Sequence, residues 1–163
     1  MPEGPEVRRE ADMISSALAG KVVKKIWAES PNLNKNISLL RGKKVKNVFS
    51  MGKALLIEFP GSKYIYSHNQ LYGKWFVIPE SETLQTNRRL RLSLVTSGHQ
   101  ALLYSASMIE FLDREQFENH TYLKNLGLNV LDSEVSEKAV SERLKESRFS
   151  RRQLSSLYLD QKF

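Results

Sequence analysis

Two residues at the start of the sequence, Pro2 and Glu3, have the chemistry of a nucleophile beside an acid–base group. Methionine before a small residue is usually removed, and loss of Met1 would give Pro2 a free secondary amine. Such an amine attacks a sugar C1′ carbon to form an iminium, and its reference pKa of ~8 keeps more of it neutral than the ~10.4 of lysine. Glu3 would then serve as the general acid or base. If Met1 is retained, Pro2 is an amide nitrogen without this reactivity, and the same residues are an ordinary lead-in to a helix.

A lysine and a triplet further along the chain have side chains suited to holding DNA. Lys53 follows Gly52 in an expected turn, where a cation is able to reach a backbone phosphate. At an expected hairpin tip, Gln70-Leu71-Tyr72 combines an amide, an aliphatic and an aromatic side chain, which suit a wedge that fills the gap left by a flipped base. Taken alone, Lys53 is better explained as a surface lysine, and Leu71 and Tyr72 as core residues beside a turn.

Basic residues are in excess and are clustered along the chain. The 163 residues have a formal net charge of +7. A polyanionic partner would explain this, because each phosphate that a protein neutralises releases condensed counterions. Solvated faces on a moderately basic protein are the alternative. The clusters are Lys21/Lys24/Lys25, Lys43/Lys44/Lys46, Arg88/Arg89/Arg91 and Arg148/Arg151/Arg152.

The composition argues against several other classes of protein. The absence of cysteine excludes disulfides and thiolate metal sites. The three histidines, His68, His99 and His120, lack metal-ligand spacing. No apolar run approaches the ~20 residues needed to cross a bilayer, and the start lacks a signal-peptide pattern. We therefore expect a metal-free cytoplasmic protein.

An N-terminal helix and a series of short strands must position these residues. Pro5 suits a first helical turn, Gly20 suits a helix end, and an apolar stripe at helical spacing between them predicts a helix over 5–19. Closely spaced apolar segments with short turns predict a sandwich or barrel of strands. The expected strands are 21–27, 45–49, 54–59, 64–67, 74–78, 90–94 and 101–105.

From Met108 the character of the sequence changes. Short helical pieces are expected over 113–126, a helix over 136–146 with Ser136 as its N-cap, and another helix from about Arg151. The sequence stops at Phe163 without a cap or turn signal, apparently inside that last helix, which favours a truncated chain. We predict a domain over residues 1–125 and the incomplete start of a helical domain over 126–163.

Several separate blocks, in order, resemble the endonuclease VIII branch of the formamidopyrimidine-DNA glycosylase family. The resemblance runs from end to end of the chain, which makes it far more specific than any single block. The blocks are Met1-Pro2-Glu3-Gly4-Pro5-Glu6-Val7-Arg8-Arg9, Met51-Gly52-Lys53-Ala54-Leu55-Leu56, Tyr66-Ser67-His68-Asn69-Gln70-Leu71-Tyr72-Gly73-Lys74-Trp75, Leu103-Tyr104-Ser105-Ala106-Ser107 and Leu157-Tyr158-Leu159-Asp160-Gln161.

The resemblance implies a fold and a reaction. The fold is α+β: an N-terminal helix plus a two-layered antiparallel β-sandwich, followed by the first helices of a helix-two-turn-helix domain. The reaction is that of a bifunctional glycosylase and AP lyase of base-excision repair, with β,δ-elimination. The implied substrate is double-stranded DNA with oxidised bases or abasic sites, bound by a monomer.

The resemblance also assigns roles to individual residues. It makes Pro2 the Schiff-base nucleophile, Glu3 its acid–base partner and Glu6 a supporting carboxylate. Lys53 contacts the phosphate beside the lesion. Gln70, Leu71 and Tyr72 enter the DNA, and such a contiguous triplet is typical of the branch that removes oxidised pyrimidines.

Departures from the family pattern leave alternatives open. The sequence does not continue into a complete helix-two-turn-helix element or a zinc finger, so we expect no zinc cofactor and weak or absent activity. A DNA-binding fragment without turnover is the main alternative. An N-terminal-proline tautomerase also fits Pro2, but it leaves the basic clusters and Gln70-Leu71-Tyr72 unexplained.

Overall fold

The computed structural model describes residues 2–129 and 132–163. The chain divides into two compact units, Met1–Phe117 and Glu118–Phe163. The domain boundary expected after residue 125 stays a prediction. Among the described residues, no helix is both long enough and apolar enough to span a membrane.

The first element is the helix α1 (Gly4–Leu18), which agrees with the helix predicted over 5–19. Pro5 lies in its first turn, where a missing backbone N–H costs no helical hydrogen bond. The chain leaves the helix at Gly20, whose φ of 78° suits glycine. The apolar stripe is buried, and its members are Val7, Ala11, Ile14, Ala17 and Leu18.

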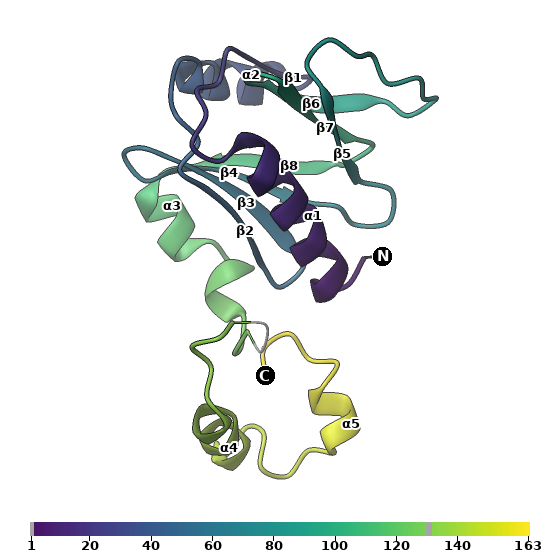
Figure 1. Ribbon diagram of the computed structural model, residues 1–163. Coiled ribbons are helices and arrows are strands. Elements are labelled where there is room, and N and C mark those ends of the chain that lie inside the picture. Colours follow the sequence, from purple (N-terminus) through teal and green to yellow (C-terminus); the bar gives the residue numbers. More distant parts are fainter. Residues whose placement is uncertain (1, 130–131) are drawn as a thin grey trace. The chain divides into compact units, whose positions relative to one another are not determined.

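The strands form two antiparallel sheets of four strands each (Figure 1). One sheet has the order β1-β6-β7-β5, with bounds Lys25–Ala28, Leu90–Val95, His99–Tyr104 and Lys74–Pro79. The other has the order β2-β3-β4-β8, with bounds Asn47–Met51, Ala54–Phe59, Lys63–His68 and Met108–Leu112. The helix and the two-layered antiparallel sandwich expected from the family resemblance are confirmed.

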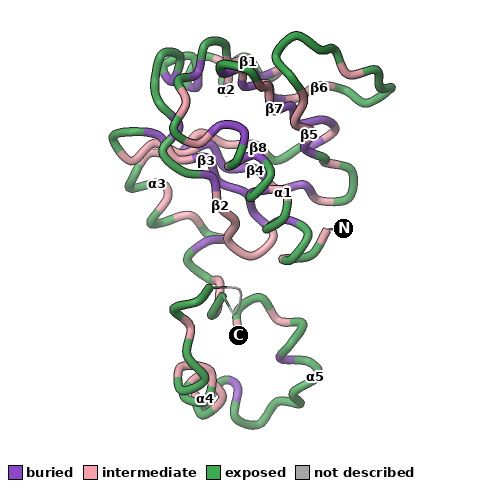
Figure 2. Tube along the Cα trace, in the orientation of Figure 1, coloured by how far each residue is buried: buried purple, intermediate pink, exposed green. Residues whose placement is uncertain are grey.

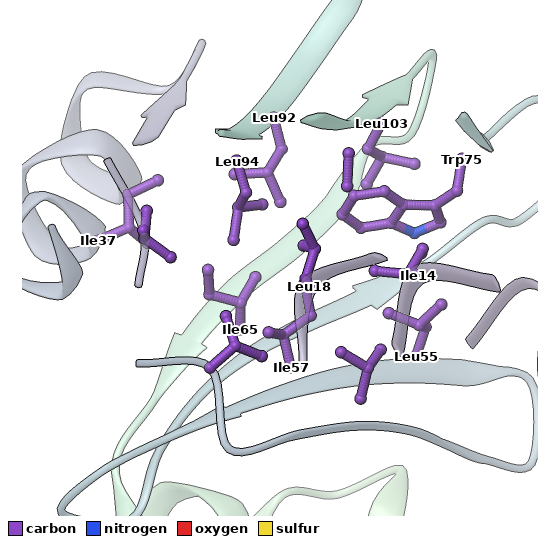
Figure 3. Packing of buried hydrophobic residues seen from close by; sticks show 14 of the residues in the cluster. Ile14, Leu18, Ile37, Leu55, Ile57, Ile65, Trp75, Leu92, Leu94 and Leu103 are labelled. Atoms are coloured by element: carbon purple, nitrogen blue, oxygen red, sulfur yellow. The ribbon is translucent and has the colours of Figure 1, made fainter. Parts of the chain in front are cut away.

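Helix α1 packs against both sheets and contributes to their shared core. Its buried stripe lies against β2 and β3 of one sheet and β5 and β7 of the other. Many of the buried positions of this unit lie along α1 and on strands of both sheets, edge strands included (Figure 2). Each fully buried aliphatic side chain contributes about 1.5–3 kcal/mol of transfer free energy. Figure 3 shows Ile14 and Leu18 between Leu55, Ile57 and Ile65 on one side and Trp75, Leu92, Leu94 and Leu103 on the other.

Some elements of this unit differ from the sequence prediction. Helix α2 (Pro31–Ile37), followed by the 3-10 turn η1 (Ser38–Leu40), is not predicted because only two residues of the helix are buried, which gives no recognisable period. Strand β8 is an edge strand with one buried residue, so it shows no clear alternation. The strand predicted from residue 21 begins at Lys25, because Val22 makes only an isolated bridge with Lys44.

The second unit consists of short helices. Its regular elements are the end of α3 (Arg114–Asn119), η2 (Leu123–Asn125), α4 (Glu137–Lys145) and α5 (Leu154–Leu157). The Ser136 hydroxyl accepts a hydrogen bond from the Ala139 amide at 3.2 Å, as expected of an N-cap. The prediction of a helix that begins near Arg151 and continues to the end of the sequence is wrong. Helix α5 has four residues, and the chain turns after it, with Asp160 bound to the Arg152 guanidinium at 2.6 Å.

Candidate functional site

The start of α1 and the turn between β2 and β3 bring Glu3 and Lys53 into contact. Glu3 is the N-cap residue of α1. Lys53 lies in the tight turn of a hairpin whose last paired residues are Met51 and Ala54. The Lys53 ammonium lies 2.8 Å from Oε1 and 2.7 Å from Oε2 of Glu3. The Lys53 side chain is only 12% exposed, whereas that of Glu3 is 62% exposed, so a partly buried cation holds an accessible carboxylate.

Local backbone geometry fixes this contact. Gly52 has a φ of 57°, a left-handed conformation that a tight turn requires and that glycine adopts without strain. The Glu6 carboxylate accepts a hydrogen bond from the Glu3 backbone amide at 2.9 Å. This contact is half of a capping box, and it places negative charge where the helix dipole is positive.

The sequence-predicted residues Glu3, Glu6 and Lys53 are therefore brought together at one end of α1. Pro2 is half-buried and precedes Glu3 in the chain. Met1 lies outside the described residues, so its removal stays a prediction. A neutral amine here would have a carboxylate and an ammonium beside it, which suits proton transfer and the stabilisation of negative charge.

The predicted wedge residues lie in a loop of residues 69–73, hereafter the 69–73 loop. Leu71 is 68% exposed and Tyr72 is 71% exposed, so neither belongs to the core. The sequence predicts that these residues form the tip of a hairpin, and this prediction is wrong. The loop joins β4 to β5, which belong to different sheets, so the connection must cross between layers. The Gln70 side-chain carbonyl accepts a hydrogen bond from the Ser107 hydroxyl.

The Lys53 turn and the 69–73 loop lie at the same end of one sheet. Ala54, next to Lys53, pairs with His68, which directly precedes the loop. His68 Nδ1 accepts a hydrogen bond from the Gln70 amide at 3.1 Å. Burial lowers the pKa of His68, and the positive charge of Lys53 lowers it further, so the ring is neutral near pH 7. The sequence assigned His68 no role, yet it connects the two predicted groups of site residues.

Two members of the Arg88/Arg89/Arg91 cluster are paired with an acidic residue. Arg89 and Arg91 both bind the Glu29 carboxylate, Arg91 at 2.8 Å. The Arg88 guanidinium donates to the Tyr72 carbonyl at 2.7 Å and so supports the 69–73 loop. Within the described ranges, no group of histidine, cysteine, aspartate and glutamate side chains is arranged to hold a metal ion.

Comparison with known sequences identifies similar proteins. Residues 1–118 match the sequence profile of the formamidopyrimidine-DNA glycosylase N-terminal domain. Two curated relatives, both named Endonuclease 8, come from Shigella flexneri serotype 5b (strain 8401) and Escherichia coli (strain 55989 / EAEC). Each is 47% identical over 163 residues, which are 100% of this chain and 62% of the relative. The chain thus spans less than two thirds of the length of these relatives.

Solved structures of lower sequence identity share the fold. A complex between the Lactococcus lactis Fpg and an abasic site containing DNA has a TM-score of 0.73 and 19% identity, over 99% of this chain and 61% of that chain. MutM in complex with carbocyclic 8-oxo-G containing DNA has a TM-score of 0.72 and 20% identity, with the same coverage. At this level of identity, the likeness establishes the arrangement of the helix and the two sheets alone.

Proposed function

Because this chain belongs to the formamidopyrimidine-DNA glycosylase family, we propose that it is a DNA glycosylase with AP lyase activity in base-excision repair. The observation that carries the proposal is the ion pair between Glu3 and Lys53 beside Pro2, at the exposed start of α1. A carboxylate and an ammonium adjacent to an N-terminal amine are the groups that a Schiff-base reaction at a sugar requires.

In the proposed reaction, the neutral Pro2 amine donates its electron pair to C1′ of the damaged nucleotide. The bond from C1′ to the base breaks, the base leaves with the bonding pair and takes up a proton, and the proline nitrogen loses its own proton. Protonation of O4′ opens the sugar ring and gives the iminium. Loss of a C2′ proton expels the 3′ phosphate, and loss of the C4′ proton expels the 5′ phosphate, before water releases the enzyme.

Each neighbour of Pro2 has a role in this proposal. Glu3 takes up the proton that the proline nitrogen loses and delivers it to O4′, and its high exposure supports access to a sugar. Lys53 holds the Glu3 carboxylate in the DNA-free protein and contacts the phosphate beside the lesion in the complex. Glu6 fixes the Glu3 backbone through its hydrogen bond to the Glu3 amide.

The 69–73 loop supports a substrate class. We propose that Gln70, Leu71 and Tyr72 fill the gap left by an extruded oxidised pyrimidine, and the exposure of Leu71 and Tyr72 supports this role. The partner is then duplex DNA with oxidised bases or abasic sites, bound by a monomer in the bacterial cytoplasm. The nucleophile is the protein's own amine, so these steps draw on no cofactor in this chain.

Borohydride trapping on an abasic-site duplex tests the proposal, combined with the intact mass of the protein. We expect an adduct joined at Pro2 in protein that lacks Met1. Glu3→Gln serves as the control variant and should form about 10²-fold less adduct, because proton transfer is lost, while duplex affinity is largely kept. An adduct formed by protein that retains Met1 would show that the nucleophile is misassigned, because Pro2 is then an amide nitrogen. Duplex binding without any adduct would make the chain a DNA-binding fragment without turnover.

A further inference from the structure

The carboxylate of Glu10 holds both ends of the 69–73 loop. Its Oε2 accepts a hydrogen bond from Nδ2 of Asn69, the first residue of the loop, at 2.5 Å. The backbone amide of Trp75, just beyond the loop in β5, also donates to this carboxylate. Asn69 is 3% exposed, so the contact is shielded from water and is stronger than a surface hydrogen bond. One side chain on α1 thus contacts the residue that begins the loop and a residue of β5 just after the loop.

Further contacts hold the backbone within the loop. The Gly73 amide donates to the Asn69 carbonyl at 2.7 Å. A Cβ on Gly73 would lie 2.5 Å from that carbonyl oxygen, so the approach of the two backbones requires glycine. The Tyr72 carbonyl is held by Arg88. The backbone is therefore fixed, whereas the side chains of Leu71 and Tyr72 point into solvent and are available to a partner.

Glu10 lies on the same face of α1 as the candidate active-site carboxylates. Glu3, Glu6 and Glu10 are spaced by three and four residues, which brings them to one side of a helix. Seven residues correspond to about 10 Å along the helix axis. The rigid helix therefore joins the residues beside Pro2 to the anchor of the 69–73 loop.

We propose that Glu10 is a positioning residue, which sets the distance between the DNA-penetrating side chains of the 69–73 loop and the Pro2 amine by fixing both loop ends to α1. This inference rests on the proposed function for the role of the loop, and the Glu10 contacts themselves are independent of it. A fixed separation matters because the loop must fill the gap while C1′ lies within reach of the nucleophile.

Burying the Glu10 carboxylate costs free energy, which is consistent with a positioning role and not with a contribution to stability. Burial raises the pKa of Glu10, and the hydrogen bonds from Asn69 and Trp75 and the charge of Lys74 oppose that rise. Across the described part of the chain, Asn69 Oδ1 has no hydrogen-bond partner. An apolar pair of similar shape would avoid both the burial of the Glu10 carboxylate and the unpaired oxygen of Asn69. The Glu10–Asn69 pair is therefore not the most stable choice of residues at these two positions.

Amide hydrogen exchange of the full chain, measured by NMR without DNA, tests the anchoring directly. In Glu10→Ala, we expect the amides of Gly73 and Trp75 to exchange about tenfold faster or more. The Trp75 amide loses its acceptor, and Asn69, whose carbonyl accepts from the Gly73 amide, loses the contact that holds its side chain. Asp12→Ala is the matched control. Asp12 is a carboxylate on the same helix, in an exposed pair with Arg8 at 3.0 Å, and its loss should leave both amides unchanged. Unchanged exchange in Glu10→Ala would overturn the proposal.

Swapping the amide and the carboxylate between positions 10 and 69 distinguishes an effect of this hydrogen bond from a general effect on packing. Asn69→Asp alone places two carboxylates together and should loosen the loop. Adding Glu10→Gln lets the new amide donate to the new carboxylate while its oxygen still accepts from the Trp75 amide. We expect the double variant to recover the wild-type exchange of Gly73 and Trp75. If it exchanges as fast as the single variant, the Glu10–Asn69 contact does not hold the loop.

DNA substrates distinguish failure of this inference from failure of the proposed function. Glu10→Ala should form less borohydride adduct than wild type on an abasic-site duplex, yet an equal amount on a single-stranded abasic oligonucleotide, which has no stack to fill. Equal loss on both substrates would place Glu10 in the chemistry and contradict a positioning role. If the wild type forms no adduct on either substrate, the proposed function fails, and the exchange measurements still decide whether Glu10 anchors the loop.

Discussion

At the scale of single residues, the charge of Lys53 acts on two parts of the candidate site. Lys53 binds Glu3 and also acts on His68 through its positive charge. Nδ1 of a neutral His68 accepts a hydrogen bond from the Gln70 amide, which a doubly protonated ring cannot do. The charge of Lys53 therefore supports both the carboxylate beside Pro2 and the conformation at the start of the 69–73 loop.

The lowered pKa of His68 predicts a loss of stability in acid. The folded-state pKa lies below the ordinary value of ~6.5, so the stabilisation is complete above that value and is lost as the pH falls through the folded-state pKa. His68→Asn keeps an acceptor for the Gln70 amide without titrating. Thermal unfolding from pH 7.5 to 5 should show a smaller decrease in midpoint for His68→Asn than for wild type. Parallel curves would show that His68 does not couple pH to folding.

At the scale of elements, local pattern predicts some of the fold and tertiary contact determines the rest. The apolar stripe of α1 and the apolar run of β3 can be recognised as a helix and a strand in the sequence, because each buries a regular set of positions. The edge strand β8 and the crossing of the 69–73 loop between sheets depend on which strands pair. No local period carries that information.

The candidate site also has features that the local sequence predicts and features that depend on tertiary contacts. Pro2 and Glu3 are neighbours in sequence, so their chemistry is readable from it, whereas the Glu10–Asn69 contact joins residues 59 positions apart. One signal was present. Glu10 lies three residues after Val7 and four before Ile14, both buried, so a charged residue occupies the core-facing side of an amphipathic helix. Such a residue needs a buried partner, although the sequence does not say which one.

The exposure of the 69–73 loop side chains predicts that folding and DNA recognition are separable. Replacing Leu71 and Tyr72 together by alanine should change the thermal midpoint little, since both are about 70% exposed, while preference for lesion-containing duplex is lost. Leu103→Ala is the control, because a buried leucine costs about 2–5 kcal/mol when truncated. Calorimetry and competition binding measure the two effects. A destabilisation of the double variant close to that of Leu103→Ala would assign both residues a structural role.

At the scale of the whole molecule, the 25 lysines and arginines overstate the number of cations available to DNA. Several basic residues are already bound to acidic ones: Lys24 to Glu80, Lys46 to Glu58, and Arg89 and Arg91 to Glu29. Exposed pairs of this kind add little to stability, typically 0–1 kcal/mol, so DNA phosphates compete with them readily. The acidic residues in these pairs nevertheless limit how many lysines and arginines can bind a phosphate without first breaking an ion pair.

Glu29 offers the sharpest test of this charge distribution, because one carboxylate binds two guanidinium groups. Glu29→Gln should tighten non-specific duplex binding and steepen the plot of log affinity against log salt by about 0.9 per arginine released. Glu82→Gln changes the net charge equally at an exposed position and should leave the slope near that of wild type. Fluorescence anisotropy over a range of salt concentrations measures both slopes. Equal slopes in the two variants would mean that Arg89 and Arg91 face away from the bound duplex, and that the phosphate-binding surface lies among the other basic clusters.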